Sequence, residues 1–230
     1  MILFEHVTKR YPNGREALVG VGFRVGTGEL VFLTGRSGAG KSTVLKLIAL
    51  IERPTRGTVL VGGKNLGVLR SRHIPAYRRS IGVVFQDHRL LLDRPVFDNV
   101  ALPLVVAGFS PKEMDKRVLA ALDQVGLLGY ERALPIELSV GEQQRVGIAR
   151  AVVSKPSVLI CDEPTGNLDR DLALEVMRLL RRFQSVGVTV VVATHDVQFV
   201  QEFGQRTIVL EGGRILGGAE EPLPSMVASR

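Results

Sequence analysis

The chain has 230 residues, of which 45% are hydrophobic and 23% charged, and its formal net charge is +7. This length and apolar content predict one domain, or one domain with an inserted lobe, around a sizeable core. A single cysteine excludes an internal disulfide, and no uncharged apolar run approaches the ~18 residues that a membrane-spanning helix needs. The acid Glu5 comes too early for a signal peptide. We therefore expect a soluble protein in the reducing cytosol.

The first predicted elements are short strands at Ile2–Val7 and Ala17–Val25, whose alternating pattern favours an antiparallel sheet. A strand with a continuously apolar centre, Glu29–Thr34, comes next and is followed by a helical pattern over Lys41–Ile51. Further strands are expected at residues 58–61, 81–85, 158–161, 188–193 and 207–210, and further helices at 172–183 and 197–203.

Three strands are apolar without interruption, namely Leu30–Leu33, Val158–Cys161 and Val188–Ala193. Such strands suit a parallel sheet that is buried on both faces. Each of them ends in polar residues, at the edge where an α/β sheet binds its ligands. The sequence therefore predicts an α/β fold with a mostly parallel sheet beside a smaller antiparallel one.

The middle of the chain, from about residue 90 to residue 151, has a helical pattern instead. Ser110 and Glu113 form a predicted capping box with Pro111 at the first helical position. We expect an inserted helical lobe within a single domain over residues 1–218. The last residues, 219–230, are predicted to be a flexible tail.

A glycine-rich run joins the strand at Glu29–Thr34 to the next helix and fits the phosphate-binding P-loop pattern. Its glycines let backbone N–H groups surround phosphate oxygens at the positive end of the helix. Lys41 is expected to reach the β- and γ-phosphates, and Ser42 to bind Mg²⁺. The predicted nucleotide-binding run is Gly35, Arg36, Ser37, Gly38, Ala39, Gly40, Lys41, Ser42 and Thr43.

Two adjacent acids, Asp162 and Glu163, follow the apolar strand Val158–Cys161. Neighbouring carboxylates repel each other unless a cation or solvent relieves them. Asp162 fits a carboxylate that holds Mg²⁺ directly or through water, and Glu163 fits the base that polarises an attacking water. The alternative is a solvated loop start, and the P-loop in the same chain disfavours it.

A second capping box is predicted at Ser139 and Glu142, at the start of a helix whose positive end can receive an anion. Taken alone, the pattern indicates no more than a well-capped helix. The sequence that follows, Gln143-Gln144-Arg145, favours the anion-binding interpretation.

In their order along the chain, these motifs resemble those of the ATP-binding cassette (ABC) ATPases. The matching residues are Tyr11, the P-loop, Gln86, the signature run at Ser139, Asp162-Glu163, Gly166-Asn167-Leu168-Asp169 and His195.

The resemblance implies a P-loop ATPase core with an antiparallel subdomain and an inserted helical subdomain. It also implies a head-to-tail homodimer with two ATP molecules, each held between one P-loop and the partner's signature residues. By this resemblance, Tyr11 stacks on adenine, Gln86 senses Mg²⁺ and the attacking water, and His195 contacts the γ-phosphate. Asp169 helps to link the subunits. Ser139, Gly141 and Glu142 contact the opposing ATP, and Ser42, Gln86 and Asp162 serve the metal.

Within that family the chain is similar to the cell-division cassettes of the FtsE group. The resemblance lies in Phe85–Leu91, the opening Ile2–Val7 and the run Gln144–Val153. It implies an integral membrane partner resembling FtsX, control of cell-wall hydrolysis during septation, and a peripheral place on the cytoplasmic face of the bacterial inner membrane. Other division proteins are further candidate partners.

Two alternative functions stay open at this point. One is the ATPase subunit of a transporter that releases lipoproteins or exports drugs, and the other is a nucleotide-gated division scaffold. A nucleic-acid role is not expected, because repair and translation cassettes carry a coiled-coil insert or a second cassette that this length does not allow.

One position departs from the family signature, which usually has glycine where this chain has Val140. Glycine allows close backbone approach to the opposing γ-phosphate, whereas the branched valine side chain adds bulk. We hypothesise that Val140 weakens or slows closure of the dimer.

The densest cationic run, Arg70, Arg72, His73, Arg78 and Arg79, is interpreted first as a solvated surface. An excess of positive charge also favours acidic partners, such as nucleic acid, anionic lipid headgroups or acidic protein loops.

Overall fold

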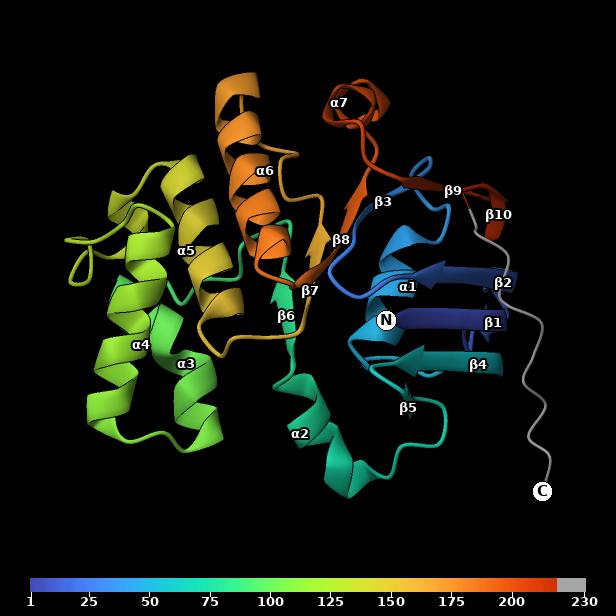
Figure 1. The fold of residues 1–230 in the computed structure, drawn as a ribbon, viewed down its shortest axis with the longest axis horizontal. Helices are drawn as coiled ribbons and strands as arrows, with labels where there is room; N and C mark the ends of the chain where they lie inside the picture. Colours follow the sequence, from blue (N-terminus) through green and yellow to red (C-terminus); the bar gives the residue numbers. More distant parts are fainter. Residues whose placement is uncertain (219–230) are drawn as a thin grey trace.

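The computed structural model describes residues 1–218 and contains two sheets (Figure 1). The smaller sheet is antiparallel and has the strand order β2-β1-β4-β5. Its strands are β1 (Ile2–Arg10), β2 (Glu16–Val25), β4 (Arg56–Val61) and β5 (Lys64–Asn65). The predicted antiparallel sheet is thus confirmed, although β1 and β2 are longer than expected.

The larger sheet has six strands in the order β10-β9-β3-β8-β7-β6, and its first pair, β10 and β9, is antiparallel. The remaining neighbours are parallel, and β3 and β8 are buried along their whole length. The strands are β3 (Leu30–Thr34), β6 (Ile81–Val84), β7 (Val158–Asp162), β8 (Thr189–Thr194), β9 (Thr207–Glu211) and β10 (Arg214–Gly217).

Successive side chains of β3 enter two different cores, because a strand alternates its faces. Leu30 and Phe32 pack in one core with the helical part of the chain, while Val31 and Leu33 pack in the other with the antiparallel sheet. Helix α1 (Lys41–Ile48) lies in the second core, between the two sheets, and α6 (Arg170–Ser185) lies in the first. The mostly parallel sheet is therefore covered on both faces, and the predicted α/β fold class is confirmed.

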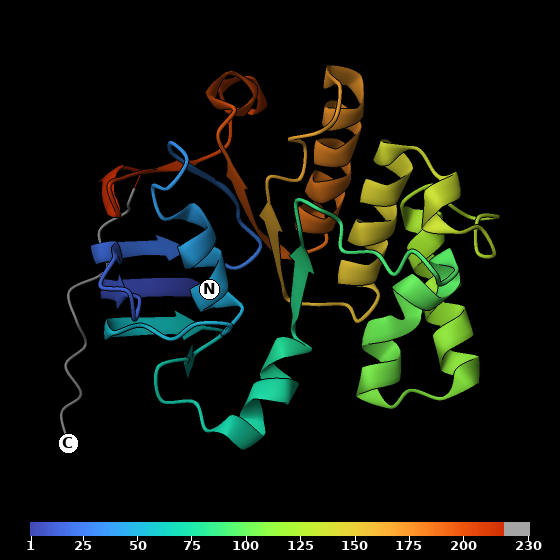
Figure 2. The same cartoon turned by 180° about the vertical axis from the view of Figure 1, so that it is seen from behind.

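Three helices gather at one end of the molecule, opposite the antiparallel sheet (Figures 1 and 2). They come between β6 and β7 in the chain and are α3 (Val96–Ala107), α4 (Pro111–Gln124) and α5 (Val140–Val152). The remaining helices are α2 (Ile74–Arg78), α7 (Val197–Phe203) and two 3₁₀ turns, η1 (Ser71–His73) and η2 (Pro135–Glu137). The predicted tail, residues 219–230, lies outside the described residues.

Several local expectations need correction. Helix α1 ends at Ile48 rather than Ile51, because Leu50 takes a left-handed conformation with φ 53°. The predicted capping box at Ser110 does not form: Ser110 is the N-cap, but the Glu113 carboxylate accepts from Arg117 at 2.7 Å instead. The box at Ser139 is confirmed, with both of its hydrogen bonds present.

Within residues 1–218, no helix combines the length and the apolarity needed to span a bilayer.

Candidate nucleotide site

The loop between β3 and α1 has a backbone that only glycine fits at two positions. Gly35 has φ 146°, and a Cβ there would lie 2.2 Å from the Leu210 carbonyl oxygen. Gly40, the N-cap of α1, has φ 114°, and a Cβ there would lie 2.7 Å from the Ala17 carbonyl oxygen. Both positions tolerate these angles and contacts because glycine has no side chain. The loop is therefore fixed in a tight curve against β2 and β9.

The first turn of α1 contains no acid. Its N-cap residue is Gly40, so among the described residues no side-chain capping hydrogen bond forms at this helix end. The backbone N–H groups of this turn thus keep their hydrogen-bonding capacity for a ligand. Together with the partial positive charge at a helix N-terminus, they form a suitable seat for an anion.

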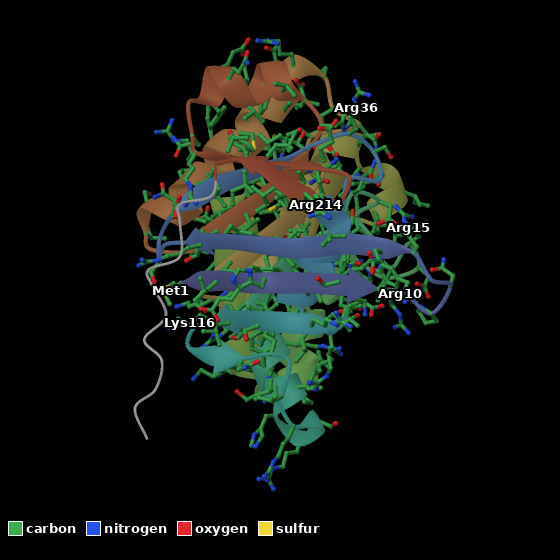
Figure 3. The ribbon with its side chains drawn as sticks, turned by 90° about the vertical axis from the view of Figure 1, so that its right-hand side faces the viewer. Met1, Arg10, Arg15, Arg36, Lys116 and Arg214 are labelled. Atoms are coloured by element: carbon green, nitrogen blue, oxygen red, sulfur yellow. The ribbon has the colours of Figure 1, made fainter. Side chains whose placement is uncertain are left out.

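This loop forms part of a cavity of about 1110 Å³. Other parts of the chain contribute Tyr11, Gln86, Asp162, Glu163 and His195 to its lining. All the P-loop residues predicted from the sequence, Gly35 to Thr43, line the same cavity. Arg15 and Arg36 add positive charge to the lining and lie on one flank of the molecule (Figure 3). A cleft with this charge favours an anionic ligand.

Glu163 connects the P-loop lysine with the histidine at the end of β8. Its Oε1 lies 3.7 Å from Lys41 Nζ and 2.9 Å from His195 Nδ1, and the carboxylate side chain is 11% exposed. The His195 backbone N–H donates to Glu163 Oε2 at 3.3 Å. Glu163 itself has a left-handed φ of 48°, which is uncommon for a residue with a side chain. Such a conformation aims the carboxylate away from the line of β7 and into the cavity.

Lys41 donates to the Gly35 carbonyl at 2.7 Å as well as facing Glu163. Its side chain is therefore folded back along the inside of the P-loop. The ammonium lies where it can meet the phosphates of a nucleotide seated on the loop.

Asp162 lies at the carboxyl end of β7, and Ser42 Oγ donates to its Oδ1 at 3.3 Å. Burial raises the pKa of Asp162, and the charge of Glu163 adds to this effect, whereas the Ser42 hydrogen bond opposes it. A nearby cation would relieve both unfavourable effects. A hydroxyl, a carboxylate and the amide oxygen of Gln86 are hard oxygen ligands of the kind that Mg²⁺ prefers. Among the described residues, no three His, Cys, Asp or Glu side chains gather as a metal cluster.

Tyr11 lines the cavity beside the C-terminal part of the P-loop. Its hydroxyl lies 3.4 Å from Thr43 Oγ1, and Lys9 Nζ lies 5.1 Å from the centre of its ring. The ring is half-buried, so one part of it remains open to a ligand.

The predicted signature residues are not part of this cavity lining. Ser139 is exposed and caps α5: its Oγ accepts from the Glu142 N–H at 3.3 Å, and its own N–H donates to Glu142 Oε2 at 2.8 Å. The hydrogen bonds from Ser139 lower the pKa of Glu142. Gly141 packs against Leu172 of α6, where a Cβ would lie 3.1 Å from Leu172 Cδ1. Val140 is 48% exposed at the first position of the helix.

The ABC transporter family model matches residues 18–166, which is more than half of the chain. The chain belongs to the ATP-binding cassette ATPases.

Relatives and solved structures support this membership over almost the full length of the cassette. This chain is 55% identical over 218 residues to the cell division ATP-binding protein FtsE of Escherichia coli, and the match covers 95% of this chain and 98% of that one. It is 48% identical to FtsE of Bacillus subtilis, covering 94% and 95%. The dimeric cassette MJ0796, in a post-hydrolysis state bound to ADP and Pi, has a TM-score of 0.85 at 36% identity, covering 94% of this chain and 97% of that one.

Sequence reasoning missed two arginines near the site of the cassette. Arg15 Nη2 donates to the Gly38 carbonyl of the P-loop at 3.4 Å. Arg150, near the end of α5, donates to the His88 carbonyl and, at 2.7 Å, to the Arg89 carbonyl, in the loop that follows Gln86. Backbone carbonyls leave no trace in a sequence pattern, so only the folded structure reveals these contacts.

Proposed function

We propose that the cassette binds Mg²⁺-ATP in this cavity and hydrolyses it by attack of water on the γ-phosphate. The observation that carries the proposal is the placement of Glu163. Its carboxylate contacts both Lys41 and His195 in a cavity bounded by a phosphate-binding loop. A carboxylate in this position can accept a proton from a water beside the γ-phosphate.

The other residues of the cavity serve binding and charge stabilisation in this proposal. The P-loop N–H groups and Lys41 hold the β- and γ-phosphates, and Tyr11 takes the adenine ring. His195 contacts the same Glu163 oxygen, Oε1, that faces Lys41, and would orient the γ-phosphate. Positive groups fixed before the reaction stabilise the charge that develops on the phosphate oxygens.

Ser42, Asp162 and Gln86 are the proposed Mg²⁺ residues. Their oxygen donors and the hydrogen bond between Ser42 and Asp162 support this assignment. When bound, the ion supplies charge neutralisation at the β- and γ-phosphates.

The exposed, capped start of α5 supports a head-to-tail homodimer, and the similar MJ0796 cassette is dimeric. Ser139, Gly141 and Glu142 lie outside the cavity of their own chain. In the proposed dimer they reach the ATP held by the P-loop of the second copy. Asp169, the N-cap of α6, would lie near the same interface.

The likeness to the FtsE proteins of several bacteria supports a role in cell division. We propose that the dimer drives an integral membrane partner resembling FtsX, and so regulates cell-wall hydrolysis from the cytoplasmic face of the inner membrane. Gln86 and the loop after it would transmit the change, since Gln86 lines the cavity and Arg150 of α5 donates to the Arg89 carbonyl in that loop.

The proposal is tested with Glu163→Gln, which keeps the shape of the side chain but removes its charge. We expect unchanged ATP binding and a loss of turnover of at least about 100-fold, as for other catalytic acid–base groups. Binding is measured with a fluorescent ATP analogue and turnover by phosphate release. Near-normal hydrolysis in this variant would remove Glu163 from its role.

A cell that carries only the Glu163→Gln chain distinguishes the cell-division motor from the alternatives. If the cassette is a motor that needs ATP hydrolysis, septation should fail in this cell. Normal septation would favour a nucleotide-gated scaffold. Mass spectrometry of the membrane proteins that co-purify with the cassette separates a division partner from a transporter subunit.

A further inference from the structure

The positive charge of the cassette is concentrated in one stretch of the chain. Between Glu52 and Asp87 there is no acidic residue, and all seven charged side chains of this stretch are cations. They are Arg53, Arg56, Lys64, Arg70, Arg72, Arg78 and Arg79. Because the whole chain has a net charge of +7, the remainder of the chain is balanced.

Residues 66–79 of this stretch, here called the basic arm, comprise a loop, η1 and α2. In both opposite views the arm projects from the edge of the molecule that lies below β6, away from α6 and α7 (Figures 1 and 2). It is a convex feature, at the amino end of β6 rather than at the carboxyl ends where the cavity lies.

The arm is held in place by hydrogen bonds and by two buried side chains, Leu66 and Tyr77. Arg53 donates to the Leu66, Gly67 and Leu69 carbonyls at 3.0, 2.6 and 2.6 Å. Tyr77 is 2% exposed and donates to the Ile48 carbonyl. Arg78 donates to the Leu50 carbonyl at 2.9 Å. The arm therefore presents its other side chains from a fixed frame.

Arg70, Arg72 and Arg79 are exposed and take no part in this frame. Within residues 1–218, none of the three forms an ion pair with a carboxylate. The apolar side chain of Val68 lies next to them in the chain and is 76% exposed. Uncompensated cations beside an exposed apolar side chain match a surface that is anionic outside and apolar beneath.

We propose that the basic arm binds the anionic phospholipid headgroups of a bilayer, with Val68 entering the interface. The arm is convex, so it suits a broad deformable surface better than a single peptide in a groove. A single-stranded nucleic acid would need several aromatic side chains for stacking, whereas the arm offers one exposed imidazole, His73, and its one phenolic ring, Tyr77, is buried. The inference rests on the proposed function only in that a membrane partner would keep the arm near the leaflet.

The test uses the full chain and flotation with phosphatidylcholine vesicles that either contain or lack phosphatidylglycerol. Arg70→Gln, Arg72→Gln and Arg79→Gln are combined in one variant. The matched control neutralises three other exposed arginines, Arg132→Gln, Arg178→Gln and Arg182→Gln. Each arginine near a charged surface strengthens binding roughly fivefold, so we expect the arm variant to bind on the order of 100-fold more weakly. The control variant should bind vesicles as the wild-type chain does. Val68→Asp should bind them more weakly, as the arm variant does.

Binding should require phosphatidylglycerol and weaken as salt is added, because salt screens exposed charges. Equal losses in the arm variant and the control would overturn the proposal, as would equal binding to both kinds of vesicle. Displacement of the cassette from vesicles by duplex DNA or by an acidic peptide at lower concentration than the lipid would assign the arm to that partner instead.

ATP turnover of the arm variant, without vesicles, separates this inference from the proposed function. We expect it to equal the wild-type rate, because none of the three arginines lines the cavity. If the wild-type chain binds vesicles but shows no ATPase activity, the inference about the arm stands and the proposed function is wrong. If the wild-type chain hydrolyses ATP at a normal rate but does not bind vesicles, the proposed function stands and the inference about the arm is wrong.

Discussion

Asp162 is a carboxylate whose surroundings in the folded chain disfavour its charge. Burial and the adjacent Glu163 raise its pKa above the ordinary value of 3.8. Because the pKa is raised by folding, the folded chain binds a proton at Asp162 more readily than the unfolded chain does. The charge of Asp162 therefore destabilises the fold once the pH rises above the pKa of an unfolded aspartate. We infer that nucleotide binding, rather than folding, is what this residue serves.

Asp162→Asn should therefore stabilise the nucleotide-free protein at neutral pH, by about 1 kcal/mol or less because the side chain is partly solvated. The difference should vanish at more acidic pH, where the wild-type carboxyl is protonated. Thermal denaturation of both chains across this pH range measures it. A gain that is independent of pH would show that the charge is not the cause, and Ser42→Ala serves as a control for the lost hydrogen bond.

Val140 places an exposed branched side chain at the start of α5, beside the N–H groups that would face an anion. We expect Val140→Gly to strengthen ATP-dependent dimerisation by roughly 1 kcal/mol, about fivefold, and to raise the ATPase rate. Val140→Ala should lie between the two, since it removes the branch but keeps a Cβ. Sedimentation with ATP on a Glu163→Gln background measures the dimer. If neither dimerisation nor ATPase rate increases in the glycine variant, Val140 does not limit closure.

At the scale of elements, the side chain of Arg150 joins helix α5, which begins at the signature residues, to the loop after Gln86. Arg150 donates from α5 to two successive carbonyls, those of His88 and Arg89, and both of these residues have a left-handed φ. A planar guanidinium can serve two carbonyls at once, whereas an ammonium cannot do so with the same geometry. The two elements are thus expected to move as one.

Arg150→Lys should leave ATP binding intact but lower kcat by about tenfold, because a bond to a positioned catalytic loop is worth roughly 1–2 kcal/mol. The freed loop should also be cut faster by trypsin after Arg89. Arg117→Lys is the control, because Arg117 pairs with Glu113 within α4 and does not contact this loop. Faster cleavage with an unchanged kcat would mean that the contact holds the loop but does not serve catalysis.

Two capping boxes with the same sequence pattern have different outcomes, which shows what a local motif leaves open. Glu142 returns to the Ser139 N–H, whereas Glu113 turns to Arg117 one helical turn later. The residue four positions after Glu142 is Val146, which carries no charge, and the nearby Arg145 pairs with Glu175 instead. A favourable local pattern therefore forms only when no stronger neighbour takes the same carboxylate.

At the scale of the whole molecule, the proposed active unit contains two chains, and Ser139 allows this to be tested without loss of the cap. Ser139→Asp keeps an N-cap of similar quality but adds a negative charge that would face the γ-phosphate of the second copy. We expect normal stability and normal ATP binding by the monomer, with no ATP-dependent dimer. Gel filtration with ATP on the Glu163→Gln background measures it. Ser110→Asp, at the exposed N-cap of α4, is the matched control. A dimer that forms normally in Ser139→Asp would contradict the composite site.

Much of the fold was predictable because burial leaves a strong local signal. The uninterrupted apolar runs at β3, β7 and β8 identified the buried centre of the sheet. β5 and β10 were missed because β5 has two polar residues and β10 has only two apolar residues, Ile215 and Leu216, which are adjacent. Helix α1 was predicted too long, since its apolar pattern continues past Ile48 while the backbone turns at Leu50.

The sequence by itself determined the P-loop, the paired acids at the end of β7 and the capped start of α5, because each depends on residues that are close in the chain. Only the tertiary structure decided that Glu163 meets both Lys41 and His195, and that Arg150 holds the loop after Gln86. These contacts join side chains and carbonyls that are distant in the chain. They form because the parallel strands bring their carboxyl ends to one edge of the sheet, which is a property of packing and not of any short motif.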